Sequence, residues 1–135
     1  GMGIASPGSL QSLVDYWNSA AFLPASCDTC IGEDGNFTGY HQYQLDEDEN
    51  VRMGFISSTG DNVVTSNPAV FGAELIEAVA ELEEANPERF RSLISFTEEH
   101  TYIIKQFDFG IGNTTVRQWV TDMLDRNDDW ESASD

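Results

Sequence analysis

Cys27 and Cys30 stand three residues apart, which is the spacing of a metal chelate or of a redox-active dithiol. A structural zinc ion needs four ligands, and the other soft candidates in the chain are His41 and His100. Such a set would lack the second closely spaced pair of typical zinc sites. The redox alternative needs the first cysteine at a helix N-terminus, whereas Gly32 and the glycine at 35 predict a turn. We therefore favour incidental cysteines with no metal and no cofactor, and a metal site and a redox site stay open as alternatives.

The remaining residues form no catalytic pattern. No serine lies in the Gly-x-Ser-x-Gly sequence of a nucleophile elbow. The acidic run from 46 to 50 fails as an EF-hand, because the sixth position is Val51 instead of glycine. His41 falls on an expected strand and His100 in an expected turn, where a histidine is more often a packed or surface residue than a base. We expect no catalytic residues and a protein that is not an enzyme.

The charge of the chain is its most informative property. Twenty-four Asp and Glu residues face six Lys and Arg residues, which gives a formal net charge of −18 over 135 residues. Nucleic acids and anionic membranes bind through clustered Lys and Arg, so this balance argues against both partners. It suggests a salt-tolerant cytosol or a basic partner, and simple solubility is an equally good explanation.

The chain has the length of a single domain, and 40% of its residues are hydrophobic, enough for a core. We expect a flexible arm at 1–8, one domain at 9–127 and an acidic disordered tail at 128–135. Gly1 before Met2 is typical of the residue left by a cleaved expression tag. There is no secretory signal pattern and no apolar run long enough to span a bilayer, so we expect a cytoplasmic protein.

Three helices are expected from apolar residues at helical spacing. The first begins after Ser9 and ends near 20–21, the second begins with Asn67 as cap and Pro68 at the first position, and the third begins near 113–114. Alternating patterns and turn residues predict strands at 37–45, 51–56, 63–65, 93–97 and 101–109, with a possible short strand at 26–31. Tight turns between strands favour antiparallel pairing. The predicted fold class is therefore α+β, an antiparallel sheet with three helices in the order α-β-β-β-α-β-β-α.

The segment from Leu75 to Leu124 resembles a known family. A helix runs into Glu84-Ala85-Asn86, Arg89-Phe90 and a strand, and a later strand ending Phe107-Asp108-Phe109 leads through Gly110 and Gly112 into a capped helix. This pattern is similar to the YbjN-like family of bacterial sensory transduction regulators. The resemblance covers about 50 residues, and the N-terminal half agrees with the family only in element order. It implies the fold that the family shares with type III secretion chaperones.

The resemblance implies a small acidic module that binds other proteins, is often homodimeric and catalyses nothing. We therefore expect a non-enzymatic protein-interaction or regulatory module, chaperone-like and homodimeric. One alternative is an acidic nucleic-acid mimic or immunity protein that inhibits a basic nuclease or DNA-binding protein. A second alternative is a zinc or redox protein that uses Cys27 and Cys30.

Overall fold

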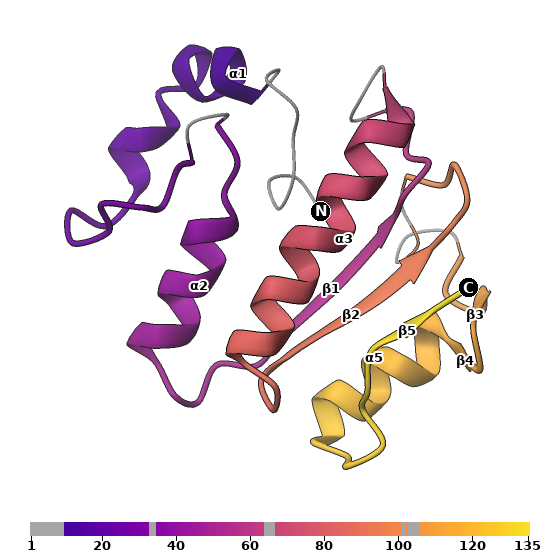
Figure 1. Ribbon diagram of the computed structural model, residues 1–135. Helices are drawn as coiled ribbons and strands as arrows, with labels where there is room; N and C mark the ends of the chain where they lie inside the picture. The colour runs from indigo at the N-terminus through magenta and orange to yellow at the C-terminus, as the bar shows by residue number, and fades with distance from the viewer. Residues whose placement is uncertain (1–9, 33–34, 64–66, 101, 103–105) are drawn as a thin grey trace.

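The computed structural model describes residues 10–32, 35–63, 67–100, 102 and 106–135. Helices and a small sheet make up a mixed α and β fold (Figure 1). The elements are α1 (Leu10–Tyr16), η1 (Ser19–Phe22), α2 (Thr38–Glu47), β1 (Met53–Ser58), α3 (Pro68–Ala85), β2 (Phe90–Ser95), β3 (Gly110–Ile111), β4 (Thr114–Thr115), α5 (Val116–Asp125) and β5 (Ala133–Ser134). The helices expected from 67 and from 113–114, and the strands at 51–56 and 93–97, are confirmed within a few residues. The expected arm at 1–8 lies outside the described residues.

The main sheet is parallel, so the expected antiparallel sheet is wrong. β1 pairs with β2 in parallel, with Met53 opposite Phe90 and Ser58 opposite Ser95, and β5 pairs with β2 on its other side. A parallel pair needs a crossover connection, and α3 supplies it between β1 and β2. The antiparallel pairing in the described chain is the short β3–β4 hairpin.

One face of the sheet is covered by α3. Phe71, Leu75, Val79 and Leu82 recur at helical spacing along α3 and are buried, as the sequence predicts. They pack with Phe55, Phe90 and Ile94 of the sheet and with Leu45 of α2. Alternate strand residues point to opposite faces, so Leu93 belongs to the other side of the sheet.

The other face is covered by α5. Its N-terminus is capped by Thr115, whose side chain accepts a hydrogen bond from the backbone N–H of Gln118. A Cβ on Gly54 would lie 2.6 Å from Met123 Sδ and 3.0 Å from the Trp119 ring, so the missing side chain lets α5 approach β1 closely. Leu124 of this helix is 70% exposed, although its spacing from Val120 predicts a place on the buried face. The sheet thus has a helix on each face.

Residues 37–45, predicted as a strand, form α2 instead. Only Leu45 of this helix is buried, so its apolar residues carry no helical periodicity that the sequence could reveal. Tertiary contacts hold it: Asn86 Nδ2 donates to Gln42 Oε1 at 2.9 Å, and Arg89 Nη1 donates to the Leu45 carbonyl at 2.6 Å. Residues 26–31, a possible strand in the sequence, contain no strand and lie in turns.

The C-terminal segment differs from the predicted acidic tail. Trp130 is buried and its ring lies 5.6 Å from that of Trp119, centroid to centroid. Ala133 and Ser134 then form β5 against β2. The expected strand at 63–65 lies largely outside the described residues, and so do 101 and 103–105 of the strand expected at 101–109. Of that second segment, Tyr102 is helical and residues 106–109 are not a strand.

The N-terminal segment lies beside this core (Figure 1). α1 ends at Tyr16, four residues before the expected end, and the short 3-10 helix η1 follows. Val14 is buried as predicted, whereas Trp17 is 53% exposed. Among the described residues, no helix is long and apolar enough to cross a bilayer.

Candidate functional site

A groove opens beside α3 on the face of the sheet that this helix only partly covers. It has a volume of about 290 Å³. We call it the α3–β5 groove, and its lining comes from α3, β2 and the β5 segment: Ile76, Val79, Ala80, Glu83, Ser92, Ile94, Phe96, Ser132, Ala133 and Ser134. Most of these side chains are apolar or small, so the groove suits an apolar ligand.

The groove exists because one helix cannot cover three strands. The buried stripe of α3 packs on β1 and β2, and no described helix lies over β5 on this face. Ile76 and Phe96 on the groove are 48% and 57% exposed, which is high for large apolar side chains. Apolar surface left in this way often marks a site of interaction with another molecule.

A polar cluster lines part of the groove. Glu83 Oε1 accepts a hydrogen bond from Ser92 Oγ at 2.6 Å and a second one from Ser132 Oγ. Ser132 Oγ also accepts from the Ser92 backbone N–H at 3.0 Å. The carboxylate therefore ties α3 to β2 and to the segment that leads into β5, and it gives the groove one acidic group.

A second candidate lies where β1 and β2 end. Ligands of open parallel sheets bind at the carboxyl ends of the strands. Here the buried Asp61 places its Oδ2 2.8 Å from His100 Nδ1, and its Oδ1 accepts from the Val63 backbone N–H at 3.0 Å. A carboxylate that orients an imidazole is one part of an acid–base site. In the described part of the chain, however, the side-chain hydrogen bond of His100 is the one with Asp61, and none joins its ring to a serine, threonine or cysteine.

Buried hydroxyl groups fill the rest of this sheet end. Thr97 Oγ1 lies 2.6 Å from Tyr102 Oη and accepts from Ser95 Oγ at 2.9 Å. Ser58 Oγ donates to the Glu99 carbonyl. These bonds hold the turn that carries His100 against the strand ends, so they account for its position without a ligand.

The structure joins Cys27 and Cys30 in a disulfide, which is not a metal-binding pair of thiolates. Cys30 is buried and lies against the first turn of α2, because a Cβ on Gly39 would be 3.6 Å from the Cys30 Cα and 1.9 Å from the Thr29 carbonyl. No helix starts directly after Cys27, as the glycines predict: α2 begins at Thr38, and its first turn lies against Cys30 in space. Cys27 is half-exposed and so can be reached by a thiol reagent.

The two histidines lie in different surroundings. His41 is half-buried on α2, and burial lowers its pKa because the charged ring loses hydration. His100 is paired with Asp61 at the sheet end. The described residues contain no group of three or more His, Cys, Asp or Glu side chains that could hold a metal ion. The four candidate zinc ligands are thus not brought together.

The residues of each candidate site are far apart in the sequence. Asp61 and His100 are 39 residues apart, and the groove joins α3 to residues 132–134, so no spacing in the sequence could have indicated either. The fold and groove define a mixed α and β protein with a small parallel sheet and an incompletely covered face. Comparison of the chain with family models, curated proteins and solved structures finds no match.

Proposed function

We propose that this chain is a protein-interaction module that binds an apolar segment of a protein partner in the α3–β5 groove. The observation that carries the proposal is the groove itself, with Ile76 and Phe96 half-exposed on it. Full burial of a large apolar side chain is worth about 1.5–3 kcal/mol, so covering the exposed half of Ile76 or Phe96 is worth roughly half of that for each. Among the described residues we find no complete catalytic site that would favour an enzyme over a binding module.

The partner is basic around its apolar anchors. A surface of net charge −18 attracts Lys and Arg and repels another acidic chain. Glu83 lies half-buried in the groove, beside the apolar lining, where it can accept hydrogen bonds from a cationic side chain. The segment we infer is therefore short, apolar in the middle and flanked by Lys or Arg.

The resemblance to the YbjN-like family and its chaperone-type fold stays a prediction, and so does the homodimer. Self-repulsion between two chains of charge −18 opposes a homodimer at low salt. Sedimentation velocity at low and high salt tests this point, since a dimer formed through the groove would strengthen as salt screens the charge.

Selection from a library of displayed peptides tests the binding proposal. We expect enrichment of peptides with two or more large apolar residues and flanking Lys or Arg. Ile76→Asp should weaken the selected peptides at least about tenfold, because a charge would be buried against apolar atoms. The matched control is Leu124→Asp on α5, which makes the same change at a 70% exposed leucine outside the groove.

Two results would count against the proposal. One is a library that yields no consensus after selection, and the other is equal loss of binding in the Ile76 and Leu124 variants. Far-UV circular dichroism of both variants separates lost binding from lost folding.

A redox function is the second candidate, and the Cys27–Cys30 disulfide favours it. A helix N-terminus beside a cysteine stabilises its thiolate, and α2 begins next to Cys30. The disulfide equally suits a structural role in an oxidising compartment, which would replace the expected cytoplasmic location. The reduction potential of the Cys27–Cys30 disulfide separates the two roles. A potential close to those of thiol oxidoreductases supports redox chemistry, and a potential far below them supports a structural bond.

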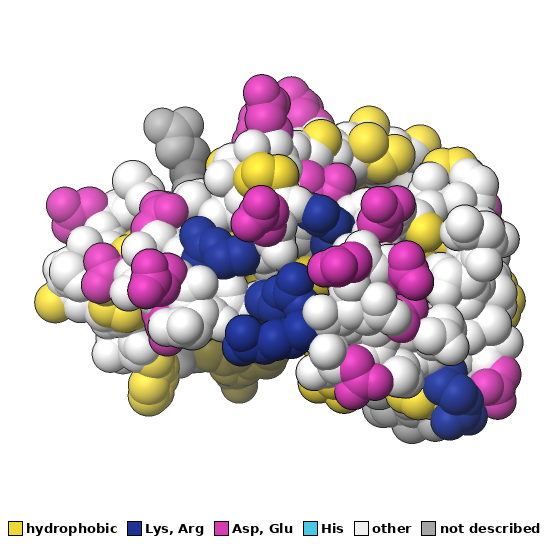
Figure 2. Space-filling model, turned by 90° about the horizontal axis from the view of Figure 1, so that it is seen from below, with side chains coloured by type: hydrophobic (Ala, Val, Ile, Leu, Met, Phe, Trp, Pro, Cys, Tyr) yellow, Lys and Arg dark blue, Asp and Glu magenta, His cyan; other side chains and the backbone are white. Residues whose placement is uncertain are grey.

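The acidic-mimic alternative requires carboxylates gathered on one face at phosphate-like spacing. On the face in Figure 2, Asp and Glu side chains are scattered and surround a group of basic side chains. That distribution gives this alternative no support from this side of the molecule.

A further inference from the structure

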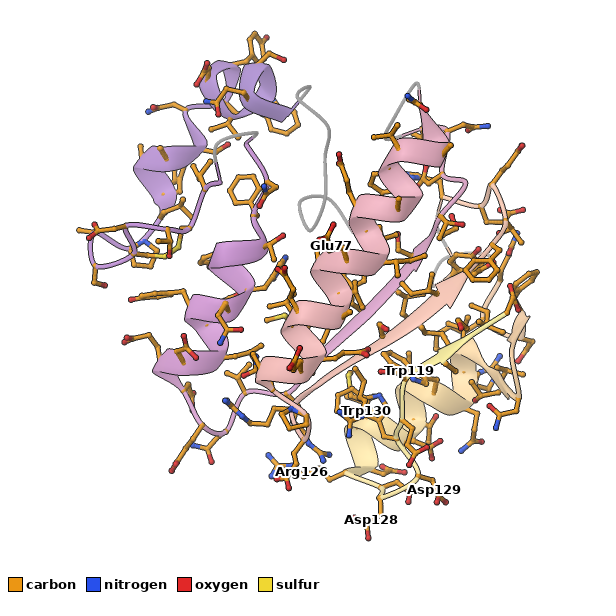
Figure 3. All side chains as sticks on the ribbon, viewed as in Figure 1. Glu77, Trp119, Arg126, Asp128, Asp129 and Trp130 are labelled. Carbon is orange, nitrogen blue, oxygen red and sulfur yellow. A yellow bond between two sulfur atoms is a disulfide. The ribbon has the colours of Figure 1, made fainter. Side chains whose placement is uncertain are left out.

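Basic side chains gather at one end of this acidic molecule. Figure 2 shows them in the middle of the face seen from the end where β1 and β2 begin. Arg52 directly precedes β1 and Arg91 lies in β2, while Figure 3 places Arg126 at the same lower end of the molecule as Trp130. The described chain contains two ion pairs, Arg117–Asp108 and His100–Asp61, so none of these three arginines is neutralised by a described carboxylate.

Arg52 and Arg91 share one aromatic ring. The Cζ atoms of Arg52 and Arg91 lie 5.2 and 6.0 Å from the centroid of the Trp130 ring. Gly54 is opposite Arg91 in the β1–β2 register, so Arg52 and Arg91 project to the same face of the sheet, the one that α5 covers. Cation–π stacking holds both guanidinium groups in place next to the indole.

Two hydrogen-bond donors in this cluster have no acceptor. Among the described residues, Trp130 Nε1 and Arg52 Nη1 are buried without a hydrogen-bond partner. Trp119, in contact with Trp130, is satisfied because its Nε1 donates to the Glu131 carbonyl at 2.7 Å. Buried donors are rarely left unpaired, so these two nitrogens call for an explanation, and an acceptor from a ligand is one.

Arg89, close by in sequence, is committed to the fold. Its guanidinium donates to the carbonyls of Leu45 and Asp48 and to Asn86 Oδ1. Arg91 donates to the Phe90 carbonyl through Nη1 and keeps its other nitrogens for a ligand. The cluster with free donors is therefore Arg52, Arg91 and Trp130.

We propose that the Arg52–Arg91–Trp130 cluster is a binding site for a compact phosphate group carried by a small ligand. Guanidinium groups match the oxygens of a phosphate, and the unpaired indole N–H of Trp130 is buried beside them, where it reports on binding. The Nη1 atom of Arg52 is enclosed, so its use by the ligand requires the half-buried side chain of Arg52 to turn outward. The site lies on the α5 face of the sheet, apart from the α3–β5 groove, and does not depend on the function proposed above.

The charge of the whole chain selects the size of the anion. A nucleic acid would extend over the surrounding carboxylates and be repelled, because such binding depends on many phosphate contacts. A single phosphate group touches only the basic cluster. Arg52 and Arg91, surrounded on the surface by carboxylates, therefore suit a small phosphorylated molecule.

Titration with inorganic phosphate at constant ionic strength tests the site, with the indole N–H resonance of Trp130 as the readout. We expect a saturable shift of that resonance, assigned with the Trp130→Phe variant. Arg52→Gln and Arg91→Gln should each weaken binding roughly tenfold or more, because each removes charge-assisted hydrogen bonds. The matched control is Arg117→Gln, which makes the same charge change at an arginine paired elsewhere with Asp108 and should bind as the wild type does.

Three results would overturn the proposal. The wild-type resonance could fail to move with phosphate, which requires no variant to fold. Acetate at the same ionic strength could bind as tightly as phosphate. A single-stranded oligonucleotide could bind more tightly than phosphate, which would make the site a nucleic-acid contact instead.

Discussion

Trp130→Ala is the substitution that best tests how the C-terminal segment folds. Trp130 is 3% exposed and packs on Trp119, five residues before the end of the chain. If residues 128–135 were a frayed tail, removing its ring would change little. In this structure the ring belongs to the core beneath α5.

The size of the effect follows from the buried area and from one unpaired donor. A buried Trp covers about 150–250 Å², worth roughly 4–6 kcal/mol at 25 cal/mol per Å². Truncation of a buried Trp to Ala typically costs about 3–5 kcal/mol. The substitution also removes the unpaired Nε1–H, whose burial costs about 1–3 kcal/mol. Subtracting the cost of the buried donor from the cost of truncation, we expect a net loss of about 2 kcal/mol in the free energy of unfolding.

Urea unfolding followed by far-UV circular dichroism measures this loss. Two variants serve as controls in the same buffer. Trp17→Ala removes a 53% exposed ring and should cost about 1 kcal/mol. Trp130→Phe keeps most of the ring and deletes the donor, so it should cost less than Trp130→Ala. Point substitution is preferable to truncation, since deleting 128–135 would also remove four carboxylates.

Equal urea midpoints for Trp130→Ala and Trp17→Ala would refute the reasoning. They would mean that Trp130 contributes no more than an exposed ring, and that β5 is not part of the cooperative unit.

Three further predictions concern the disulfide, a histidine and a helix contact. Reduction of Cys27–Cys30, or Cys27→Ser, should lower the free energy of unfolding by about 2 kcal/mol, since the bond closes a four-residue loop; an unchanged midpoint with dithiothreitol would contradict this. Burial lowers the pKa of His41, so the unfolded chain binds its proton more readily, and the stability present above about pH 6.5 is lost as pH falls through that value. His41→Gln should reduce that loss in high salt, and identical pH profiles would count against it. Gly72→Val should cost about 1–3 kcal/mol by urea unfolding, because even a Cβ would lie 2.9 Å from the Thr59 carbonyl oxygen, whereas Ala73→Val at an exposed position of α3 should be nearly neutral.

Long periodic segments are predictable from this sequence. The stripe from Phe71 to Leu82 on α3 and the pattern that begins at Val116 on α5 each mark a helix face, because a helix that packs on one side must repeat its apolar residues. β1 and β2 are short, but their apolar runs are bounded by clear turns. Local chemistry decides such elements before any long-range contact is made.

α2 shows where this reasoning fails. Its sequence offers one buried residue, Leu45, and its hold on the fold comes from Asn86 and Arg89, more than forty residues away. β5 is a similar case, because two residues become a strand only when β2 provides the pairing edge. The residues of α2 and of β5 therefore carry no pattern of their own that would predict either element.

The candidate sites also divide into those that a local sequence pattern indicates and those that only long-range contacts create. The sequence indicated Cys27 and Cys30 by their spacing but not whether they bind a metal or each other. Asp61 with His100, the α3–β5 groove, and the cluster of Arg52, Arg91 and Trp130 each join segments far apart in the chain. Their residue types are unremarkable until the fold brings them together.

The amino-acid sequence by itself determined the net charge of −18, the helices α3 and α5 and the strands β1 and β2, because composition and periodicity are local properties. Only the tertiary structure decided that β1 and β2 run parallel, since strand direction depends on how α3 crosses between them. The same crossover leaves β5 uncovered beside α3 and places arginines together where the strands begin. The residues of each candidate site are therefore neighbours because of packing, and not because of their spacing along the chain.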